Sequence, residues 1–299
     1  MANSALTTSK IVLPKEVTTQ LLTKIPNIST IASFCPQTPQ MFSDNAAIVF
    51  SRAAHAEVVG ESNVKGGYDV EPGIATGTTR KIQTTTRVSD ELQWADEDNQ
   101  MEIVNAILED QAQAHGEALD IIVYHGLNPA SGTAITEATS LVSEANVVTA
   151  TNDPQADIDA LADGLEEYVP NGFALSRAYA GELRKVRTTD GKVRVYPNIN
   201  LGSEIQGDLE GIPALSSNTV DAKGIAKTDT KVKAILGDYR NIQWGLKRSM
   251  LVDIITSGDP DGKGDLKRYN QIALRTESVL CYTIFDPKGF AVLKEKVSS

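Results

Sequence analysis

The stretch of residues that most constrains the fold runs from Asp96 to Gly126. Its apolar and small side chains recur at steps of three and four, the period of one face of an α-helix. No proline interrupts it, acidic residues crowd its first turns, and Gly126 followed by Pro129 is a stop signal. The pattern predicts a single helix of roughly 45 Å with one buried stripe. The stripe consists of Met101, Val104, Ile107, Leu108, Ala112, His115, Ala118, Leu119 and Ile122.

The composition narrows the class of protein. The 299 residues carry a formal net charge of -11, which argues against a protein that wraps nucleic acid, because neutralising phosphates needs clustered Lys and Arg. No apolar run approaches the roughly 18 residues of a membrane-spanning helix, and no signal peptide opens the chain. We therefore expect a soluble protein made in a reducing cytoplasm. Cys35 and Cys281 are expected to be free buried thiols, with a disulfide between them as the open alternative.

Two segments before the long helix are expected to reach beyond the body of the protein. Residues 1–30 begin with a small, polar stretch that we expect to be a mobile arm, followed by a short helix over Leu13–Ile25. Residues 46–90 contain two strand-forming runs, Ala46–Glu61 and Thr76–Leu92, around a glycine-bearing tip. A two-stranded hairpin is marginally stable in water, and the chain offers no obvious cover of that length. We therefore expect this hairpin to pack on a neighbouring subunit.

The rest of the chain divides into an inserted unit and a strand-rich end. After a connector rich in Ser, Thr and Ala that closes at Pro154, helical and strand-like runs alternate over 156–187, which predicts a compact α/β unit. From Lys231 onward strand-like runs dominate. These strands would cover the buried stripe of the long helix. The first and last thirds of the chain would then form one domain, with the α/β unit inserted between them.

No residue pattern in the sequence points to catalysis. The histidines, His55, His115 and His125, lack the spacing that brings helical zinc ligands together, so we expect the two on the long helix to be structural. The segment GDPDGKG at 258–264 departs from phosphate-binding and calcium-binding loops at required positions, and we expect a turn between strands. We therefore assign no catalytic, cofactor-binding or metal-binding residue and expect that the protein is not an enzyme.

One local concentration of positive charge interrupts the acidic chain, RKVRTTDGKVR at 184–194. A nucleic-acid patch is one interpretation, but no stacking aromatics are interleaved. We expect instead that this run faces an acidic surface on a neighbouring copy, where opposite charge would orient the contact. The acidic residues considered for that surface are Asp157, Asp159, Asp163, Glu166 and Glu167. The hairpin and this run supply the candidate subunit-interface residues Glu61, Lys65, Tyr68, Arg80, Arg87, Arg184, Lys185 and Arg187.

Short motifs follow one another in a characteristic order along nearly the whole chain. They are AEVVGES with Glu61 and RKIQTTTRVSDEL before the long helix, ALDIIVYHGLNPASGTA at its end, then Leu209, Gly211, Ile212 and Pro213, then Gly237, Asp238 and Tyr239, and finally Arg275, Pro287 and Phe290. In this order they resemble the major capsid protein of tailed bacteriophages, which has the Hong Kong 97-like fold.

The resemblance implies an α+β fold with a long spine helix and an extended β-hairpin loop. Residues 1–30 would be the N-terminal arm and short helix, and 46–90 the extended loop. Residues 91–150 and 232–299 would form the peripheral domain, and 151–231 the axial domain. Some members join a loop Lys to an Asn of a neighbour; Lys65 lies near the loop tip, but no matching Asn and Glu align, so we expect no cross-link.

The resemblance also implies a function without catalysis or a cofactor. The chain would self-assemble into hexamers and pentamers that form the icosahedral head shell around viral DNA. It would be assembled in the host cytoplasm and reside in the virion. The implied partners are other copies of the chain, a separate scaffolding protein, a portal, double-stranded DNA held by non-specific contact, and a decoration protein as an optional addition. No membrane is implied.

Two alternatives stay open at this point. The first is an encapsulin-like nanocompartment shell, which shares the fold but encloses enzymes, and co-purified cargo in place of DNA would identify it. The second is an α/β enzyme with 151–231 as its catalytic domain. That reading lacks a constellation of nucleophile, base and orienting group.

Overall fold

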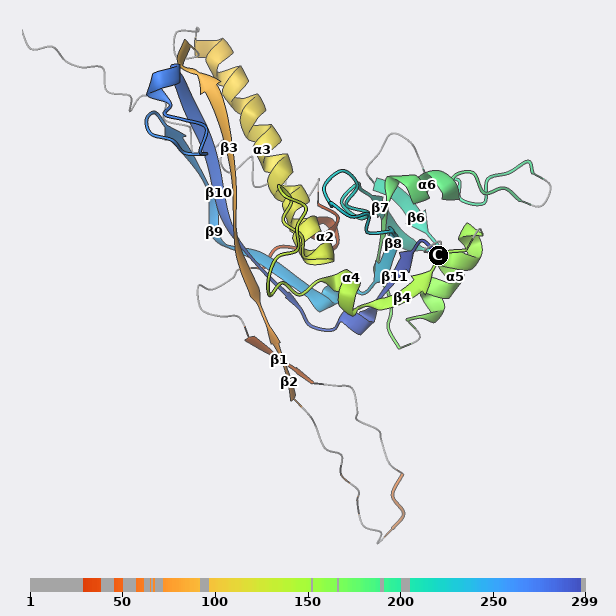
Figure 1. The fold of residues 1–299 in the computed structure, drawn as a ribbon. Coiled ribbons are helices and arrows are strands. Elements are labelled where there is room, and N and C mark those ends of the chain that lie inside the picture. Colours follow the sequence, from red (N-terminus) through yellow and green to blue (C-terminus); the bar gives the residue numbers. More distant parts are fainter. Residues whose placement is uncertain are drawn as a thin grey trace, which may run out of the picture.

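The long predicted helix is the central element of the computed structural model (Figure 1). Helix α3 spans Glu97–His125, 29 residues, and ends at Gly126, whose φ of 64° is the left-handed conformation common after helix ends. The predicted stripe is confirmed for the side chains that the structure describes. Ile107 is partly buried, and the others are buried: Val104, Leu108, Ala112, His115, Ala118, Leu119 and Ile122.

The structure describes residues 29–38, 46–50, 58–61, 65, 67, 72–91, 97–151, 153–165, 167–188, 191–199 and 205–296. The predicted helix over Leu13–Ile25 lies outside these residues. So does all but the end of the predicted N-terminal arm, 1–30. That end begins a short helix that was not predicted, α2 (Thr30–Phe34), which Ser29 caps by accepting a hydrogen bond from Ala32 N.

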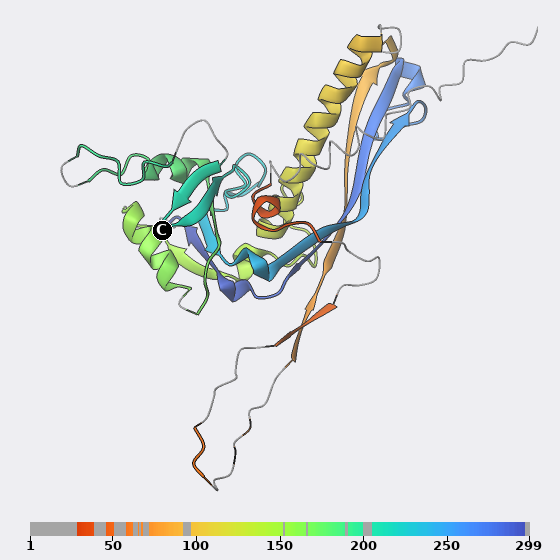
Figure 2. The ribbon, with the colours of Figure 1, turned by 180° about the vertical axis from the view of Figure 1, so that it is seen from behind.

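A three-stranded antiparallel sheet runs along one side of α3. Its strand order is β3 (Thr78–Ser89), β10 (Gln271–Ile284) and β9 (Ile242–Ile255). Figures 1 and 2 show the sheet beside the helix from front and back. Apolar side chains of β9 and β10 belong to the same buried cluster as the α3 stripe. The expectation that late strands cover the helix is therefore confirmed for these two strands.

Strand β3 shows where the hairpin prediction was wrong. All 12 residues of β3 pair with β10, from Thr78 opposite Tyr282 to Ser89 opposite Gln271. The second run of the predicted hairpin therefore finds its cover within its own chain. The local pattern could not show this, because it reports that a segment is extended but not which distant segment pairs with it.

The remaining part of the predicted hairpin is a two-stranded ribbon. β1 (Ala46–Phe50) pairs antiparallel with β2 (Pro72–Thr76). In Figures 1 and 2 this ribbon lies beyond the end of the three-stranded sheet, away from α3. No other strand in the described part of the chain joins it.

The second large unit is a six-stranded sheet. Its strand order is β4 (Asn146–Thr149), β11 (Phe290–Lys294), β8 (Val232–Gly237), β5 (Gly172–Leu175), β7 (Ile212–Ser216) and β6 (Ile205–Leu209). Helices α5 (Pro154–Asp163) and α6 (Arg177–Leu183) contribute to the core on one side of it. The short helix α4 (Leu141–Glu144) leads into β4, and neither was predicted in the connector.

The central strands of this sheet are buried on both faces. Along β11, Phe290 and Val292 belong to the core around α3, whereas Ala291 and Leu293 belong to the core around α5 and α6. Successive side chains of a strand point to opposite faces, so the sheet lies between the two cores. This explains why its strands read as continuous apolar runs.

The six-stranded sheet crosses the predicted boundaries at residues 150 and 231. β8 and β11 of segment 232–299 and β4 of segment 91–150 lie in one sheet with β5, β6 and β7 of segment 151–231. A strand that is buried on both faces needs neighbours on both edges, and here 151–231 supplies β5. The 3-10 helices η3 (Tyr239–Asn241) and η5 (Pro287–Gly289) carry the chain between the two sheets, while η4 (Lys267–Tyr269) precedes β10.

Candidate functional site

A buried carboxylate joins α3 to two segments that are distant in the sequence. Asp120 is fully buried near the end of the helix. Its Oδ1 accepts hydrogen bonds from Ser29 Oγ at 2.5 Å and Ile31 N at 3.2 Å. Its Oδ2 accepts from Thr30 N and Thr30 Oγ1, both at 2.9 Å, and from Thr219 Oγ1 at 2.6 Å. Burial raises the pKa of Asp120, and the donors act against that rise.

The hydrogen-bond chain continues from this carboxylate to the six-stranded sheet. Thr30 Oγ1 lies 2.8 Å from the Tyr124 hydroxyl, which lies 3.2 Å from the Tyr239 hydroxyl. Cys35 Sγ donates to the Tyr239 carbonyl oxygen at 2.7 Å, and burial raises the pKa of that thiol to about 12. The Tyr239 ring packs edge-on against Phe290, with centroids 5.3 Å apart. We call these contacts the Asp120 junction, since they fix the N-terminal segment, the helix and the sheet together.

The two histidines of α3 are structural, as predicted. His115 is buried, with Nδ1 2.9 Å from Ser278 Oγ and Nε2 3.1 Å from Thr276 Oγ1. His125 Nε2 lies 3.1 Å from the backbone carbonyl oxygens of residues 219–220. Burial lowers the pKa of each histidine to about 4. Both rings are therefore neutral near pH 7 and act as hydrogen-bonding partners inside the core.

Arg87, which was predicted as an interface residue, makes several contacts within its own chain. Its guanidinium contacts the Asp261 carboxylate, Asp259 Oδ1 at 3.1 Å and the Gly264 carbonyl oxygen at 2.9 Å. The hydrogen bond from Arg87 holds the pKa of Asp261 below its usual range. The arginine thus ties β3 to the GDPDGKG segment, which is a turn between strands as predicted. We call this set of contacts the Arg87 clasp.

The other candidate interface residues of 46–90 fall into three cases. Glu61 and Lys65 are exposed. Tyr68 lies outside the described residues. Arg80 donates from Nη2 to the Thr136 carbonyl oxygen at 2.9 Å, which links β3 to the connector after α3. Among these candidates, Glu61 and Lys65 are therefore the two whose side chains the structure shows to be exposed to solvent.

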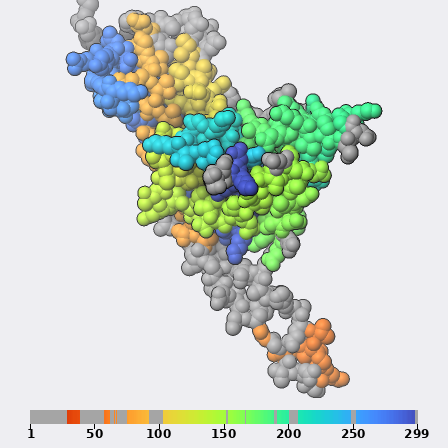
Figure 3. Space-filling view, turned by 45° about the vertical axis from the view of Figure 1, so that its right-hand side comes forward, coloured from red at the N-terminus to blue at the C-terminus, as the bar shows by residue number. Residues whose placement is uncertain are grey.

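The described residues of the basic run, 184–188 and 191–194, form a hairpin-like pairing after α6. Thr188 N donates to the Val193 carbonyl oxygen at 3.0 Å, and Arg187 lies opposite Arg194 in an antiparallel bridge. Figure 3 shows this green segment extending beyond the body of the molecule on the right. Arg184 is partly buried, and the remaining cations are exposed: Lys185, Arg187, Lys192 and Arg194.

The acidic residues expected to meet this run are not all at the surface. Asp159, Asp163 and Glu167 are exposed. Asp157 is buried and accepts hydrogen bonds from Thr151 N at 2.6 Å and Thr151 Oγ1 at 2.7 Å, so its assignment to the acidic surface was wrong. Glu166 lies outside the described residues.

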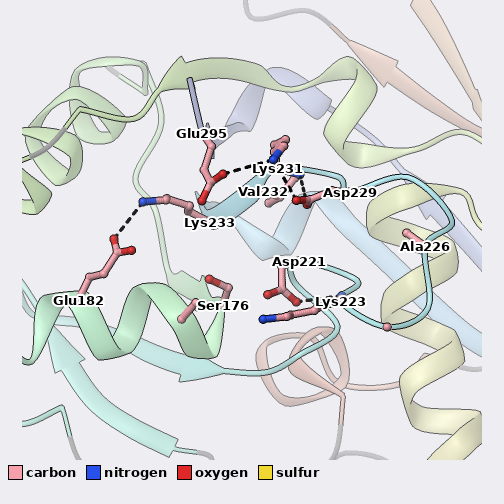
Figure 4. A pocket seen from close by; sticks show the side chains of 12 residues that line it. Ser176, Glu182, Asp221, Lys223, Ala226, Asp229, Lys231, Val232, Lys233 and Glu295 are labelled. Carbon is pink, nitrogen blue, oxygen red and sulfur yellow. Dashed lines mark hydrogen bonds and ion pairs between the residues drawn. The ribbon is translucent and has the colours of Figure 1, made fainter. Parts of the chain in front are cut away.

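A polar pocket of about 320 Å³ opens beside the start of α6. Lys233 Nζ pairs with Glu182 Oε2 at 3.0 Å, and Lys231 Nζ pairs with Asp229 at 3.0 Å and with Glu295 at 3.6 Å. Figure 4 shows these pairs around the pocket. Lys231 and Lys233 are therefore both paired with carboxylates of the same pocket.

The described residues form neither a disulfide nor a cluster of side chains that could bind a metal ion. Both cysteines are buried and neither forms a disulfide, so the disulfide alternative was wrong. Within this part of the chain, no group of three or more His, Cys, Asp or Glu side chains could hold a metal ion. Among the same residues, no helix has the length and apolarity needed to cross a membrane.

Comparisons with known proteins identify the family. The phage capsid family model matches residues 10–295. A protein of Mycobacterium phage Ogopogo has 31% sequence identity and a TM-score of 0.79, and the match covers 90% of this chain and 92% of that one. A protein of Gordonia phage Cozz has 26% identity and a TM-score of 0.74, covering 90% and 87%. Curated protein sequences give no significant match.

A more distant structure shares the fold alone. It is the capsid of a native GTA particle computed with C5 symmetry, with 15% identity, a TM-score of 0.62, and 90% of each chain covered. The resemblance read from the sequence is thus confirmed by matches over almost the full length. The matched family is one of phage capsid proteins and not an enzyme family. The chain belongs to the phage capsid family.

Proposed function

We propose that the chain is the major capsid protein of a tailed bacteriophage, with the Hong Kong 97-like arrangement. In this assignment α3 is the spine helix, and 46–90 is the extended loop, whose return strand β3 lies on the peripheral sheet. The peripheral domain combines 91–150, apart from β4, with the β9–β10 hairpin. The axial domain combines 151–231 with β4, β8 and β11, which lie in one sheet with its strands. Residues 1–30 are the N-terminal arm.

The proposed activity is self-assembly into hexamers and pentamers that close an icosahedral head shell around viral DNA. The observation that carries it is the β1–β2 ribbon, which no other strand joins in the described part of the chain. A two-stranded ribbon is marginally stable by itself because it buries too little surface. A neighbouring subunit would supply the missing contacts, so assembly would stabilise the ribbon.

The proposed partners are those of a head shell. They are other copies of the chain, a separate scaffolding protein, a portal, and a decoration protein as an optional addition. The net charge of -11 favours weak, non-specific contact with packaged double-stranded DNA, because strong phosphate binding needs clustered cations. Assembly is proposed to take place in the host cytoplasm.

Electron microscopy of the purified full chain tests this function. The expected result is closed icosahedral shells built from hexamers and pentamers. Closed shells that co-purify with an enzyme cargo, and never with phage DNA or phage assembly proteins, would favour the encapsulin-like alternative. A monomer that forms no shell under any assembly condition would contradict the proposal.

A deletion in the extended loop tests the role of the ribbon. Removing residues 58–70 keeps every β1–β2 pair, from Ala46 with Thr76 to Phe50 with Pro72. The expected product is a soluble oligomer of the size of one hexamer or pentamer, which does not assemble into stable shells. A Gly/Ser replacement of the same length is the matched control, because it keeps the reach and removes side chains such as the fully exposed Val58. Shells of wild-type stability from the deleted chain would contradict the proposed bridging role.

A further inference from the structure

On two surfaces of the unit built around the six-stranded sheet, side chains of the same charge lie close enough together to repel each other. On the basic hairpin, residues 184–194, Arg187 lies opposite Arg194 across the two strands, a position where equal charges repel. On α5, Asp159 and Asp163 are four residues apart, where like charges also repel. Asp163 is moreover the last residue of α5, at the negative end of the helix dipole. The stability of a single subunit therefore does not explain why these charges are placed together.

The basic hairpin is anchored in the core at both of its ends. Leu183, just before it, is fully buried, and Tyr196, just after it, is 7% exposed. Both belong to the core around α5 and α6. Within the hairpin, Val195 N donates to the Val186 carbonyl oxygen at 3.3 Å. Anchoring at both ends reduces the ordering that binding to these cations would require.

Neither surface is neutralised within its own subunit. In the part of the chain that the structure describes, the ion pairs involve neither the hairpin cations nor the exposed acids Asp159, Asp163 and Glu167. Each surface also has an exposed apolar neighbour, since Val193 is 61% exposed and Val169 is 75% exposed. Each surface thus offers charge and some apolar area to an outside partner.

We propose that the basic hairpin of one subunit docks on an acidic surface of the next subunit, formed by Asp159 and Asp163 of α5 and by Glu167, which follows α5 in the chain. Charge complementarity makes a second copy of the chain the favoured partner, because every copy carries both the basic hairpin and the acidic surface. The contact is heterologous, with the hairpin of each copy on the acidic surface of the following one, and contacts of this kind form rings when the rotation between copies closes. The inference rests on the proposed function and specifies how subunits within one ring recognise each other.

Charge reversal tests the contact. Arg187→Glu combined with Arg194→Glu should raise the concentration needed for assembly at least about tenfold, since facing like charges oppose docking. Asp159→Lys combined with Asp163→Lys should do the same. The chain that carries all four substitutions should assemble at the wild-type concentration, because each reversed hairpin then meets a reversed α5. Sedimentation and electron microscopy measure rings and shells.

A matched control separates the contact from the change in net charge. Lys227→Glu combined with Lys288→Glu makes the same net charge change at two exposed positions outside the hairpin, and this chain should assemble as the wild type does. The melting temperature of every variant should stay near the wild-type value, because all the substituted side chains are exposed.

The outcomes distinguish the contact from the function. Normal assembly by the reversed-hairpin chain, or failure of the four-substitution chain, would overturn this contact while the wild-type shells uphold the proposed function. A reversed-hairpin chain that forms normal shells but no longer retains DNA would also overturn the proposed contact, because the hairpin would then bind nucleic acid and not the next subunit. Absence of rings and shells from the wild-type chain would overturn both proposals.

Discussion

Replacing Asp120 with Asn tests whether the buried carboxylate holds the N-terminal segment on α3. In the wild type, Oδ1 accepts two hydrogen bonds and Oδ2 accepts three. Asn has a single acceptor oxygen, so at least two donors lose their partner whichever way the amide turns. A buried donor left unsatisfied costs about 1–3 kcal/mol, so the free energy of unfolding should fall by about 2–6 kcal/mol.

The assay is urea unfolding at one fixed protein concentration, because assembly shifts apparent stability by mass action. Fluorescence of Trp244 reports on the junction, since this buried indole donates to the Cys35 carbonyl oxygen at 2.8 Å. Asp157→Asn is the matched control. Asp157 accepts both of its hydrogen bonds from Thr151 on Oδ1 alone, so an amide can keep both, and its loss should stay below about 1 kcal/mol. Equal losses in the two variants would refute the reasoning.

Three further changes address other parts of the fold. Because the pKa of His115 is lowered from 6.5 to about 4, the unfolded chain binds the proton first, and this histidine should account for up to about 3 kcal/mol of the stability that the wild type loses as the pH falls from about 6.5 to 4. His125, whose pKa is lowered to the same value, adds a loss in the same direction. Unfolding of His115→Gln across this range should show a shallower loss, and equal slopes would contradict the assignment. Gly237→Ala places a Cβ 2.2 Å from the Phe290 ring and 2.8 Å from the Gly289 carbonyl oxygen, so thermal unfolding should show a loss of about 1–3 kcal/mol or more. Its control, Gly181→Ala in α6, meets no atom within 4 Å and should gain about 0.5–1 kcal/mol. Arg87→Gln should speed hydrogen exchange in the loop 258–266 while β3 stays protected, and equal loss of protection along β3 would contradict the clasp.

The sequence predicted best the elements whose burial is one-sided and local. The stripe of α3 was found because a helix repeats its buried face every three to four residues. Gly126 also marked the end of the helix correctly, because the chain there adopts a left-handed conformation with a φ of 64°. The Gly-Asp-Tyr step was also singled out, and it places Tyr239 in the Asp120 junction.

The parts that were missed depend on partners far along the chain. Strand β3 was expected to lack cover because its partner, β10, follows it by a long interval. Asp259 and Asp261 were considered only as loop residues, since nothing local connects them with Arg87. Asp120 left one signal that could have been used, because it is an acidic residue among Leu119, Ile121 and Ile122, which are all buried, and a buried carboxylate needs donors.

Stability and assembly are expected to depend on different parts of this chain. The Asp120 junction and the doubly buried strands satisfy their groups inside one subunit, so their loss should lower the free energy of unfolding. The β1–β2 ribbon and the basic hairpin have few partners of that kind in the described chain. Their substitution should therefore change the concentration at which shells form and leave unfolding nearly unchanged. Variants of the hairpin that lower both quantities by the same free energy would show that the hairpin supports its own subunit, and the division argued from these contacts would be wrong.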